Sequence, residues 1–590
     1  MAHRSHESRT NRIGTRLATV SLSQRTWLAI PLLAAIVVYV SYLATHPYPA
    51  FGAGLYVEIA DTISANGYAL PATVPGYTEG GVPAAYPPLM FYLTAVVRDL
   101  TGVDAMLFAT IFPGLVVIAT VVPYFYVARE FLATDRRAAF ATLIFAVAPP
   151  VLQWHLSAGG LNRAPAFFLV VTGVYAGIQL FRHDDLRWLG PALGLFSLTI
   201  LTHPTYAVCF GLNYLLLYAA FDRTSRGLVH GAVVALGGVL VTAPWWLTVA
   251  GTHGFDVFTG AAGTHSGLGG GTGRLYDEFV QPITDKNVET PFFLAAYAGS
   301  LYALVKRRFF LPVWLFVSAY VLGKLRFQFL AASLLIAILV FELAPRLADR
   351  VDDYAMPDWR ATLSFVIVGL VALSALVAGS AYAAGAVDAH AGSPSQPAFV
   401  DEHDVDAMEW AAANTVEGED FVVLGDAAEW FPLYTDRTIL VGPWGVEWTT
   451  PAQYEHHLNM FRDTSTCNRA ACITSQLEDS GHNPEYIYVP KGHYTVRGMS
   501  HQQSSGMVHS LEQSDRYQKV YENDGVLIVK VTVSDDAAAG TDRVEQSAAL
   551  AIENLRAPAD DSPTRPTADR PRRSRTSLHD SSLPVVSTPQ

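Results

Sequence analysis

Two carboxylates spaced three residues apart are the first feature of this sequence that could do chemistry. Glu58 and Asp61 lie in the stretch 46–103, between two strongly apolar runs. On a helix, this spacing puts both side chains on one face. Such a pair could bind a divalent cation, or one member could take a proton from an acceptor hydroxyl. A solvated amphipathic helix without a chemical role also fits the spacing, so both interpretations stay open.

Four basic side chains stand at the ends of apolar runs. Arg163 opens one run, His203 lies in the turn L-T-H-P-T-Y, and Lys324 and Arg326 lie in V-L-G-K-L-R-F. The planar guanidinium of Arg suits phosphate, and cations kept at a membrane against the general charge trend suggest an anionic partner. Each residue could instead be an interfacial anchor or part of a helix break.

A third group of candidates combines aromatic rings with carboxylates in the stretch 426–448. Trp430, Trp444 and Trp448 stand near Glu429 and Glu447. Rings and carboxylates of this kind can stack on a sugar and hydrogen-bond to it. They equally form the core of a small domain, and the sequence leaves the two interpretations open.

The elements that must position these residues are mostly membrane helices. The chain has 590 residues, of which 51% are hydrophobic and only 15% charged, and its mean hydropathy is +0.26. This composition is typical of a membrane protein. A helix needs about 20 apolar residues to cross a bilayer, which predicts eleven spans, at 26–45, 104–128, 137–156, 163–181, 188–202, 204–221, 228–250, 290–305, 309–323, 327–345 and 361–385. Residues 86–100 are too short and too amphipathic, and predict a helix at the membrane interface.

Charge predicts the orientation of these spans. With the N-terminus inside, the inner segments hold 18 Lys and Arg residues and the outer segments hold 6, as the positive-inside rule requires. Residues 388–533 hold 8 basic and 22 acidic residues and would lie outside the cell. The acidic block indicates no nucleic-acid partner, and it suits a high-salt exterior, which predicts a halophilic archaeal source.

The sequence therefore predicts four regions in a multi-pass protein of the plasma membrane. They are a basic cytoplasmic N-terminus (1–25), a transmembrane domain (26–385) with the outer loop 46–103, an acidic extracellular α/β or α+β domain (386–533) and a disordered tail (534–590). Cys467 and Cys472 lie in the outer domain, and could form a disulfide there or stay as free thiols.

The outer loop carries a resemblance to a known family. L-Y-V-E-I-A-D-T-I, followed by A-A-Y-P-P-L-M-F-Y, resembles the first outer loop of the C-type (GT-C) membrane glycosyltransferases, in the protein O-mannosyltransferase and aminoarabinose transferase branch. In that family the loop carries the catalytic acid and leads into a Pro-Pro-Leu-x-x-Tyr/Trp helix, matched here by residues 87–92. The family usually has Asp-Glu shortly before the Tyr-x-Glu-Ile-Ala run, where this sequence has Gly52 and Ala53.

The resemblance implies a GT-C-like enzyme that moves a sugar from a polyprenyl (dolichyl) phosphate carrier to a glycoprotein or glycan acceptor outside the cell. It implies that Lys324 and Arg326 hold the donor phosphate, with Arg163 and His203 as further donor ligands. Whether a metal takes part is left open.

The missing Asp-Glu pair leaves the catalytic acid open. Either Glu58 or Asp61 has taken its role, or the chain is an inactive lipid-sugar-binding or scaffold protein. An oligosaccharyltransferase-like enzyme is a second alternative, although the Trp-Trp-Asp-x-Gly signature of that class is absent. A coupled transporter is not supported, because the predicted spans carry no ion-pathway carboxylate apart from Glu342, near an inner end.

Overall fold

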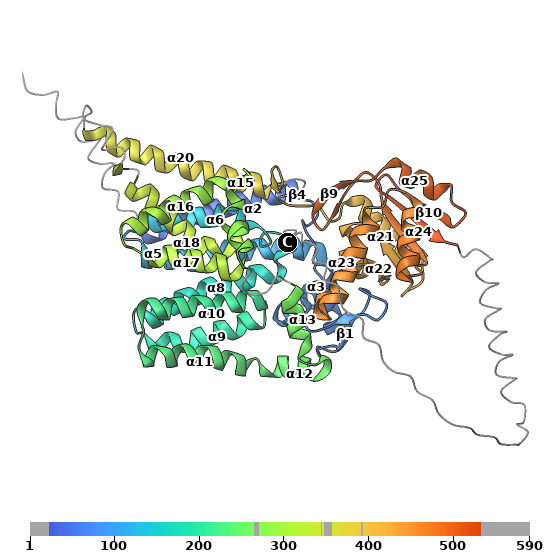
Figure 1. The fold of residues 1–590 in the computed structure, drawn as a ribbon, viewed down its shortest axis with the longest axis horizontal. Coiled ribbons are helices and arrows are strands. Elements are labelled where there is room, and N and C mark those ends of the chain that lie inside the picture. The colour runs from blue at the N-terminus through green and yellow to red at the C-terminus, as the bar shows by residue number, and fades with distance from the viewer. Residues whose placement is uncertain (1–22, 265–270, 344, 347–356, 391–392, 533–590) are drawn as a thin grey trace, which may run out of the picture. The chain divides into compact units, whose positions relative to one another are not determined.

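The computed structural model describes residues 23–264, 271–343, 345–346, 357–390 and 393–532 (Figure 1). The chain as far as Thr532 forms one compact unit. The predicted tail 534–590 and most of the predicted basic N-terminus lie outside the described residues. The predicted domain boundary at residue 386 stays a prediction.

The described apolar runs of the chain fold mainly as helices. Its helices are α2 (Gln24–Thr45), α5 (Ala105–Phe131), α6 (Asp135–Val147), α7 (Pro149–Leu152), α8 (Gly160–Phe181), α9 (Leu189–Ile200), α10 (Pro204–Phe221), α11 (Ser225–Val241), α12 (Ala243–His253), α16 (Thr290–Val305), α17 (Phe310–Leu322), α18 (Leu325–Ile338) and α20 (Pro357–Ala383), with short turns η1 (Leu186–Trp188) and η2 (Leu339–Leu343). Every predicted span coincides with one of these helices or with two consecutive ones. Six described helices are long and apolar enough to cross a membrane, or seven if α11 and α12, bent by 53°, count as one span. The predicted count of eleven spans is therefore not confirmed.

Local sequence explains where several of these helices begin and how closely they pack. The side chains of Ser23, Asp104 and Thr134 accept hydrogen bonds from backbone N–H groups in the first turns of α2, α5 and α6, as N-caps do. Helix α5 packs along α8, α2 along α6, and α18 against α16 and α17. Gly299 and Gly379 sit directly against backbone carbonyl groups of neighbouring helices. Small residues at such contacts let apolar helices approach closely.

The predicted outer stretch between α2 and α5 folds into short elements. These are α3 (Gly54–Ala65), β1 (Thr73–Val74), β2 (Val82–Pro83) and α4 (Leu89–Thr101), and a second set before α16 comprises α13 (Asp256–Thr264), α14 (Gly273–Phe279) and α15 (Gln281–Thr284). Helix α4 corresponds to the predicted interfacial helix 86–100. Its Leu93, Val96 and Leu100 side chains are exposed, which fits a helix with an apolar face turned to lipid.

Residues 395–532, here called the α/β region, combine a mixed sheet with helices. The elements are α21 (Glu402–Asn414), β5 (Asp420–Val423), η3 (Asp426–Glu429), α22 (Phe431–Thr435), β6 (Thr438–Ile439), η4 (Val446–Trp448), α23 (Pro451–Ser465), α24 (Ala470–Ser480), β7 (Tyr486–Pro490), β8 (His493–Val496), β9 (Met499–Gln502), α25 (Ser505–Glu512), β10 (Tyr517–Glu522) and β11 (Val526–Val531), preceded by the hairpin β3 (Asp388–His390) and β4 (Ser393–Pro394). The sheet order is β10-β11-β7-β5-β6, with β5 parallel to both β6 and β7. Cys467 and Cys472 form a disulfide, which confirms that pairing.

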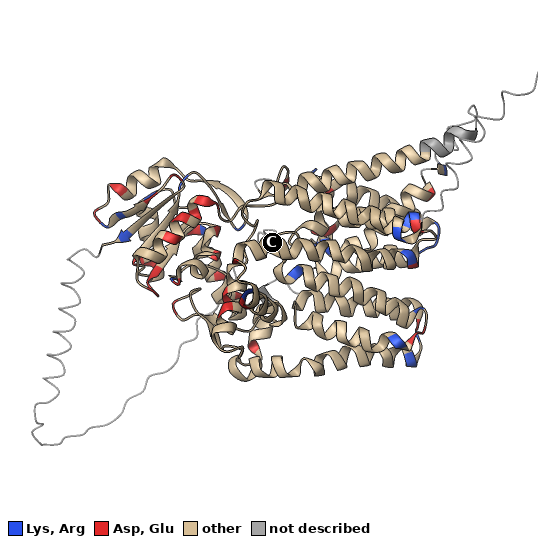
Figure 2. Cartoon of the chain, turned by 180° about the vertical axis from the view of Figure 1, so that it is seen from behind, with Lys and Arg blue, Asp and Glu red and all other residues tan. Residues whose placement is uncertain are grey.

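The charged side chains are unevenly distributed over this fold. Figure 2 shows Lys and Arg gathered at one end of the apolar helices, and Asp and Glu spread over the α/β region. The basic end is opposite to the end that α3 and α13 border (Figures 1 and 2). The end bordered by α3 holds the candidate site.

Candidate functional site

The backbone just before α3 is held in place from two sides. Phe51 N–H donates to the Pro397 carbonyl oxygen at 3.0 Å, and Ala158 N–H donates to the Ala50 carbonyl oxygen at 3.2 Å. Phe51 has a φ of 59°, in the left-handed region that a residue with a side chain adopts only when its surroundings enforce it. Its ring packs against that of Trp154, with centroids 4.1 Å apart. This strained turn presents the next residue, Gly52, to the α/β region.

The carboxylate of Glu429 occupies the space beside Gly52. A Cβ atom at Gly52 would overlap with Oε2 and Cδ of Glu429 and would lie 2.7 Å from Oε1. A Cβ atom at Gly54 would likewise overlap with the Glu429 carbonyl oxygen. The two glycines therefore let η3 of the α/β region reach the first turn of α3, which any larger residue would prevent.

The η3 turn that carries Glu429 is fixed by hydrogen bonds at both ends. Asp426 accepts from the backbone N–H groups of Arg497 and Gly498, each at 2.8 Å. The Tyr77 hydroxyl, from the loop between β1 and β2, donates to the Glu429 carbonyl oxygen at 2.7 Å. The position of the carboxylate is thus set by the outer stretch and by the α/β region together.

Glu429 is an acid without a direct partner. Its residue is only 7% exposed, and no described residue forms a hydrogen bond or an ion pair with its carboxylate. Burial raises the pKa of Glu429 to about 8, and Asp426 and Glu447 add to the rise, whereas the nearby cations Arg497 and Arg163 oppose it. At neutral pH this group can exchange a proton, as a general acid or base must.

A line of rings leads from the α/β region into the helices. The Tyr86 ring contacts that of Trp448 at 5.3 Å and that of His203 at 5.8 Å, and His203 contacts Tyr206 at 4.9 Å. Tyr56, in the first turn of α3, lies 5.5 Å from Tyr86. His203, at the start of α10, therefore lies next to Tyr86 of the outer stretch.

Three of the predicted basic ligands lie near one another at the same end of the helices. Arg163 donates to the Gly159 carbonyl oxygen at 2.6 Å and lies over the Trp154 ring. Arg326 lies over the ring of Tyr206, 5.6 Å from its centroid. Burial lowers the pKa of Lys324 to about 8, and the positive charges of Arg326 and Arg163 contribute to that fall.

A fourth cation and one acid complete this basic group. Arg274 of α14 also lowers the pKa of Lys324, whereas Glu278 opposes that effect. Burial raises the pKa of Glu278 itself to about 7, and the Gln328 amide donates to its Oε2 at 2.8 Å. No described carboxylate forms an ion pair with Arg163, Lys324 or Arg326, so the group keeps excess positive charge. Sequence reasoning did not select Arg274, and only its placement reveals it.

The two predicted catalytic carboxylates lie on another face of α3. Asp61 forms an ion pair with Arg98 of α4 at 3.1 Å. Burial raises the pKa of Glu58 to about 7, and the charges of Asp61 and Asp436 contribute. Because residues two apart on a helix point about 200° apart, Glu58 and Tyr56 face different directions. It is the Tyr56 face whose surroundings include Arg163 and Glu429.

The Glu58 and Asp61 pair does not offer a divalent cation a complete set of ligands. Among the described residues, no group of three or more His, Cys, Asp or Glu side chains is arranged to hold a metal ion. Asp61 is already engaged by Arg98, and a hard cation takes six or more oxygen ligands. We therefore assign no metal to these two carboxylates.

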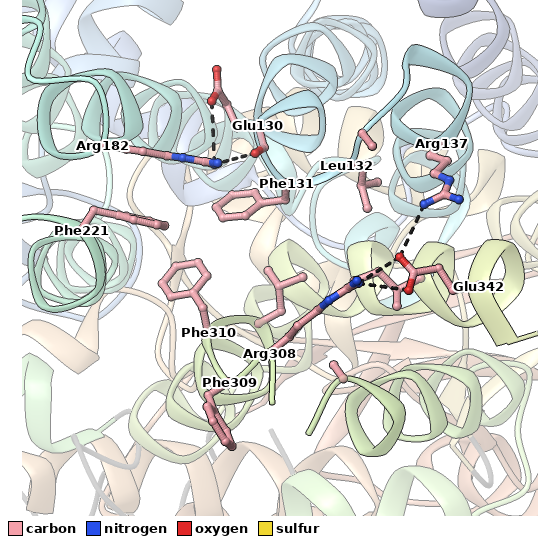
Figure 3. A pocket seen from close by; sticks show the side chains of 14 residues that line it. Glu130, Phe131, Leu132, Arg137, Arg182, Phe221, Arg308, Phe309, Phe310 and Glu342 are labelled. Atoms are coloured by element: carbon pink, nitrogen blue, oxygen red, sulfur yellow. Dashed lines mark hydrogen bonds and ion pairs between the residues drawn. The ribbon is translucent and has the colours of Figure 1, made fainter. Parts of the chain in front are cut away.

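A cavity of about 410 Å³ lies elsewhere, at the basic ends of the helices (Figure 3). The arginine side chains that line it are paired. Arg182 contacts Glu130 at 3.9 Å, and Arg308 and Arg137 contact Glu342 at 2.9 and 3.5 Å. Because carboxylates neutralise its arginines in this way, we do not identify this cavity as a binding site for the donor phosphate.

Comparisons with known proteins identify the fold. No family model and no curated protein sequence matches this chain. Several solved structures match over most of the chain, among them these three. ArnT from Cupriavidus metallidurans is 15% identical with a TM-score of 0.52, covering 86% of this chain and 98% of its own. The oligosaccharyltransferase AglB from Archaeoglobus fulgidus, in complex with an inhibitory peptide and a dolichol-phosphate, is 14% identical with a TM-score of 0.53, covering 85% and 75%. The arabinofuranosyltransferase AftD from Mycobacteria is 17% identical with a TM-score of 0.53, covering 87% of this chain and 40% of its own.

The chain thus has the fold of the GT-C membrane glycosyltransferases, as its outer stretch indicated. At these identities the likeness concerns the fold. What this particular chain does must be argued from its own residues.

Proposed function

We propose that this protein is a membrane glycosyltransferase that takes a sugar from a polyprenyl-phosphate carrier and passes it to a glycoprotein or glycan outside the cell. The observation that carries the proposal is the basic group formed by Arg163, Lys324 and Arg326. It lies next to an unpaired carboxylate and a line of aromatic rings, at the end of the helices that α3 borders.

The basic group suits a phosphate that must be bound and then released as a leaving group. Bringing several buried cations together costs free energy through mutual repulsion and lost hydration. That cost is offset when an anion binds, and hydrogen bonds to charged groups contribute about 1.5–3 kcal/mol each. In the reaction, Lys324, Arg326 and Arg163 would stabilise the charge that develops on the carrier phosphate as the bond to the sugar breaks.

The aromatic residues suit the sugar. Tyr56 and Trp448 both pack against the ring of Tyr86. The charges of Arg163 and Glu447 both act on the Tyr86 hydroxyl. Such groups stack on the apolar faces of a sugar and hydrogen-bond to its hydroxyls. His203, in contact with Tyr86 and Tyr206, is proposed as a further ligand of the phosphate or the sugar.

The distribution of charge indicates how the protein is oriented in the membrane. The Lys and Arg residues at the far ends of the helices (Figure 2) match the positive-inside rule if those ends face the cytoplasm. The site, the acidic α/β region and the acceptor would then be outside. AglB is similar in fold and was solved with a dolichol-phosphate, which supports a lipid-linked donor for this chain.

The competing hypothesis is a protein that binds the lipid-linked sugar without transferring it. It rests on the absence of an acidic residue at Gly52 and Ala53. A single assay in reconstituted liposomes decides between the two, with dolichyl-phosphate mannose and dolichyl-phosphate glucose as donors and a peptide rich in Ser and Thr as the hydroxyl-bearing acceptor. Binding with release of dolichyl phosphate supports the transferase, whereas binding without release supports the binding protein.

Variants connect that assay to the basic group. Lys324→Ala and Arg326→Ala should each weaken donor binding. Lys286→Ala is the matched control, because Lys286 is an exposed lysine in the loop before α16. Equal binding by all three variants and the wild type would reject the proposed phosphate site.

A further inference from the structure

The proposed reaction needs a base that accepts the proton of the acceptor hydroxyl. Glu58 and Asp61 are present in the outer stretch, but Asp61 is paired with Arg98, and Glu58 lies within range of the negative charges of Asp61 and Asp436. Another carboxylate, that of Glu429 from a distant part of the chain, lies beside Gly52, just before α3.

We propose that Glu429 of the α/β region is the catalytic base of this enzyme, and that Gly52 is required because the Glu429 carboxylate occupies the space of a side chain at that position. This inference rests on the proposed function and adds the identity of the base. It also explains why the chain can transfer a sugar although residues 52 and 53 carry no acid.

The first argument is the geometry of the overlap. A Cβ atom built on Gly52 would coincide with the carboxylate group of Glu429, and not with its stem. An acidic side chain at residue 52 would therefore place its carboxylate within a bond or two of the space that the Glu429 carboxylate occupies. No positive φ requires glycine at this residue, so backbone conformation does not account for it.

The second argument is the surroundings of the carboxylate. Glu429 is held through its backbone by Tyr77, whereas its carboxylate has no hydrogen bond or ion pair with any described residue. A buried ionisable group without a partner is costly in a fold with no use for it. The positive charge of Arg163 lowers the pKa of Glu429 and that of Lys324, so Arg163 lies within electrostatic range of both groups.

The reaction follows from this arrangement. A carboxylate oxygen of Glu429 takes the proton of the acceptor hydroxyl as the hydroxyl oxygen forms a bond to the anomeric carbon of the sugar. The bond from that carbon to the carrier phosphate breaks, and its electron pair leaves with the phosphate, which Arg163, Lys324 and Arg326 stabilise. The protonated Glu429 then releases its proton to water. Because one displacement occurs, the configuration of the anomeric carbon is inverted.

The pKa of Glu429 makes the step sensitive to pH. The base acts in its ionised form, and burial raises its pKa to about 8. Below pH 8 the ionised fraction falls about tenfold per pH unit, so kcat/KM of the wild type should fall in proportion.

The test uses the full-length protein in liposomes with dolichyl-phosphate mannose, and measures both donor binding and release of dolichyl phosphate. Glu429→Gln keeps the size of the side chain and imitates its uncharged form, so the fold should persist. We expect transfer to fall about 10²–10⁴-fold, donor binding to stay within about threefold, and the residual rate to lose its dependence on pH below 8.

A second variant tests the shared position directly. Glu429→Ala removes the base and opens the space beside Gly52. Adding Gly52→Asp in that background places a carboxylate there from the other side. We expect the double variant to transfer at least about tenfold faster than Glu429→Ala alone, whereas Gly52→Asp in the presence of Glu429 should not help.

The outcomes separate this inference from the proposed function. A wild type that transfers sugar, with Glu429→Gln equally active, overturns the inference and leaves the function standing. Loss of donor binding together with transfer in Glu429→Gln also overturns it, because the residue is then structural. If the wild type binds the donor but transfers no sugar, the assignment of Glu429 as the base is rejected and the donor site stands. If the wild type neither binds the donor nor transfers the sugar, both proposals are rejected.

Discussion

Adding a single methyl group at Gly52 should abolish the proposed transfer activity without removing any functional group. In Gly52→Ala, the new Cβ atom would overlap with Oε2 of Glu429 and would lie 2.7 Å from Oε1. An ordinary contact with such an atom needs at least 3.4 Å. The carboxylate must therefore move by about 1 Å or more, since the backbone on both sides is held by hydrogen bonds.

The size of the effect follows from that displacement. A misplacement of about 1 Å can cost roughly 10² in rate, and overpacking of a buried contact costs about 1–3 kcal/mol of stability. We expect kcat of Gly52→Ala to fall about 10²-fold, with donor binding unchanged. The measurement is release of dolichyl phosphate in liposomes, alongside donor binding and thermal unfolding.

Two controls test whether the loss of activity comes from displacement of the Glu429 carboxylate. Gly80→Ala is a matched change in the same outer stretch, where a Cβ atom would meet nothing within 4 Å, and it should behave like the wild type. In a Glu429→Gln background, Gly52→Ala should add less than about threefold, because the base it displaces is already absent. Full activity of Gly52→Ala, or the same loss in both backgrounds, would refute the reasoning.

Four further predictions follow from the site and the topology. Lys324→Ala and Arg326→Ala should each weaken donor binding about 10–100-fold, because each removes charge-assisted contacts worth about 1.5–3 kcal/mol; unchanged dissociation constants would reject the phosphate site. Donor binding to the wild type should weaken above pH 8, because burial lowers the pKa of Lys324 to about 8 and the neutral amine no longer attracts phosphate; a titration of binding against pH checks this. Glu58→Gln and Asp61→Asn should keep the transfer rate within about threefold of the wild-type rate. A loss of about 10²-fold in either variant would show that the base is in the outer stretch and not at Glu429. A single cysteine in place of the exposed Gln502 should react with an impermeant thiol reagent in intact cells, and labelling only after lysis would reject the outer placement of the α/β region.

Much of the fold is determined by local sequence. Every apolar run predicted as a span is helical in the structure, because a long apolar segment satisfies its backbone polar groups only within itself. The chemistry of the outer stretch was also visible, since its Tyr-x-Glu-Ile-Ala run and the Pro-Pro-Leu helix indicated the GT-C fold before any coordinates. The number of spans was less well determined. Short apolar helices such as α9 and α17 fall below the length of a membrane crossing, and their role depends on tilt and on neighbours.

The composition of the site depended on tertiary structure. Spacing predicted that Glu58 and Asp61 share a face of a helix, which is a local property, but it could not tell what that face contacts. In the structure Asp61 pairs with Arg98, and the charge of Asp436 acts on Glu58. The charges of Arg163 and Glu429 act on Tyr56, which points in another direction.

The contact between Gly52 and Glu429 could not be predicted from the sequence. No sequence pattern links Gly52 and Gly54 in the outer stretch with Glu429 in the α/β region. They meet because the strained turn at Phe51 and the hydrogen bonds of Asp426 bring two distant segments together. Sequence by itself determined which segments are helices and which residues are charged, since these depend on neighbours along the chain. Which charges share a site depends on contacts between distant segments, and only the tertiary structure decided that.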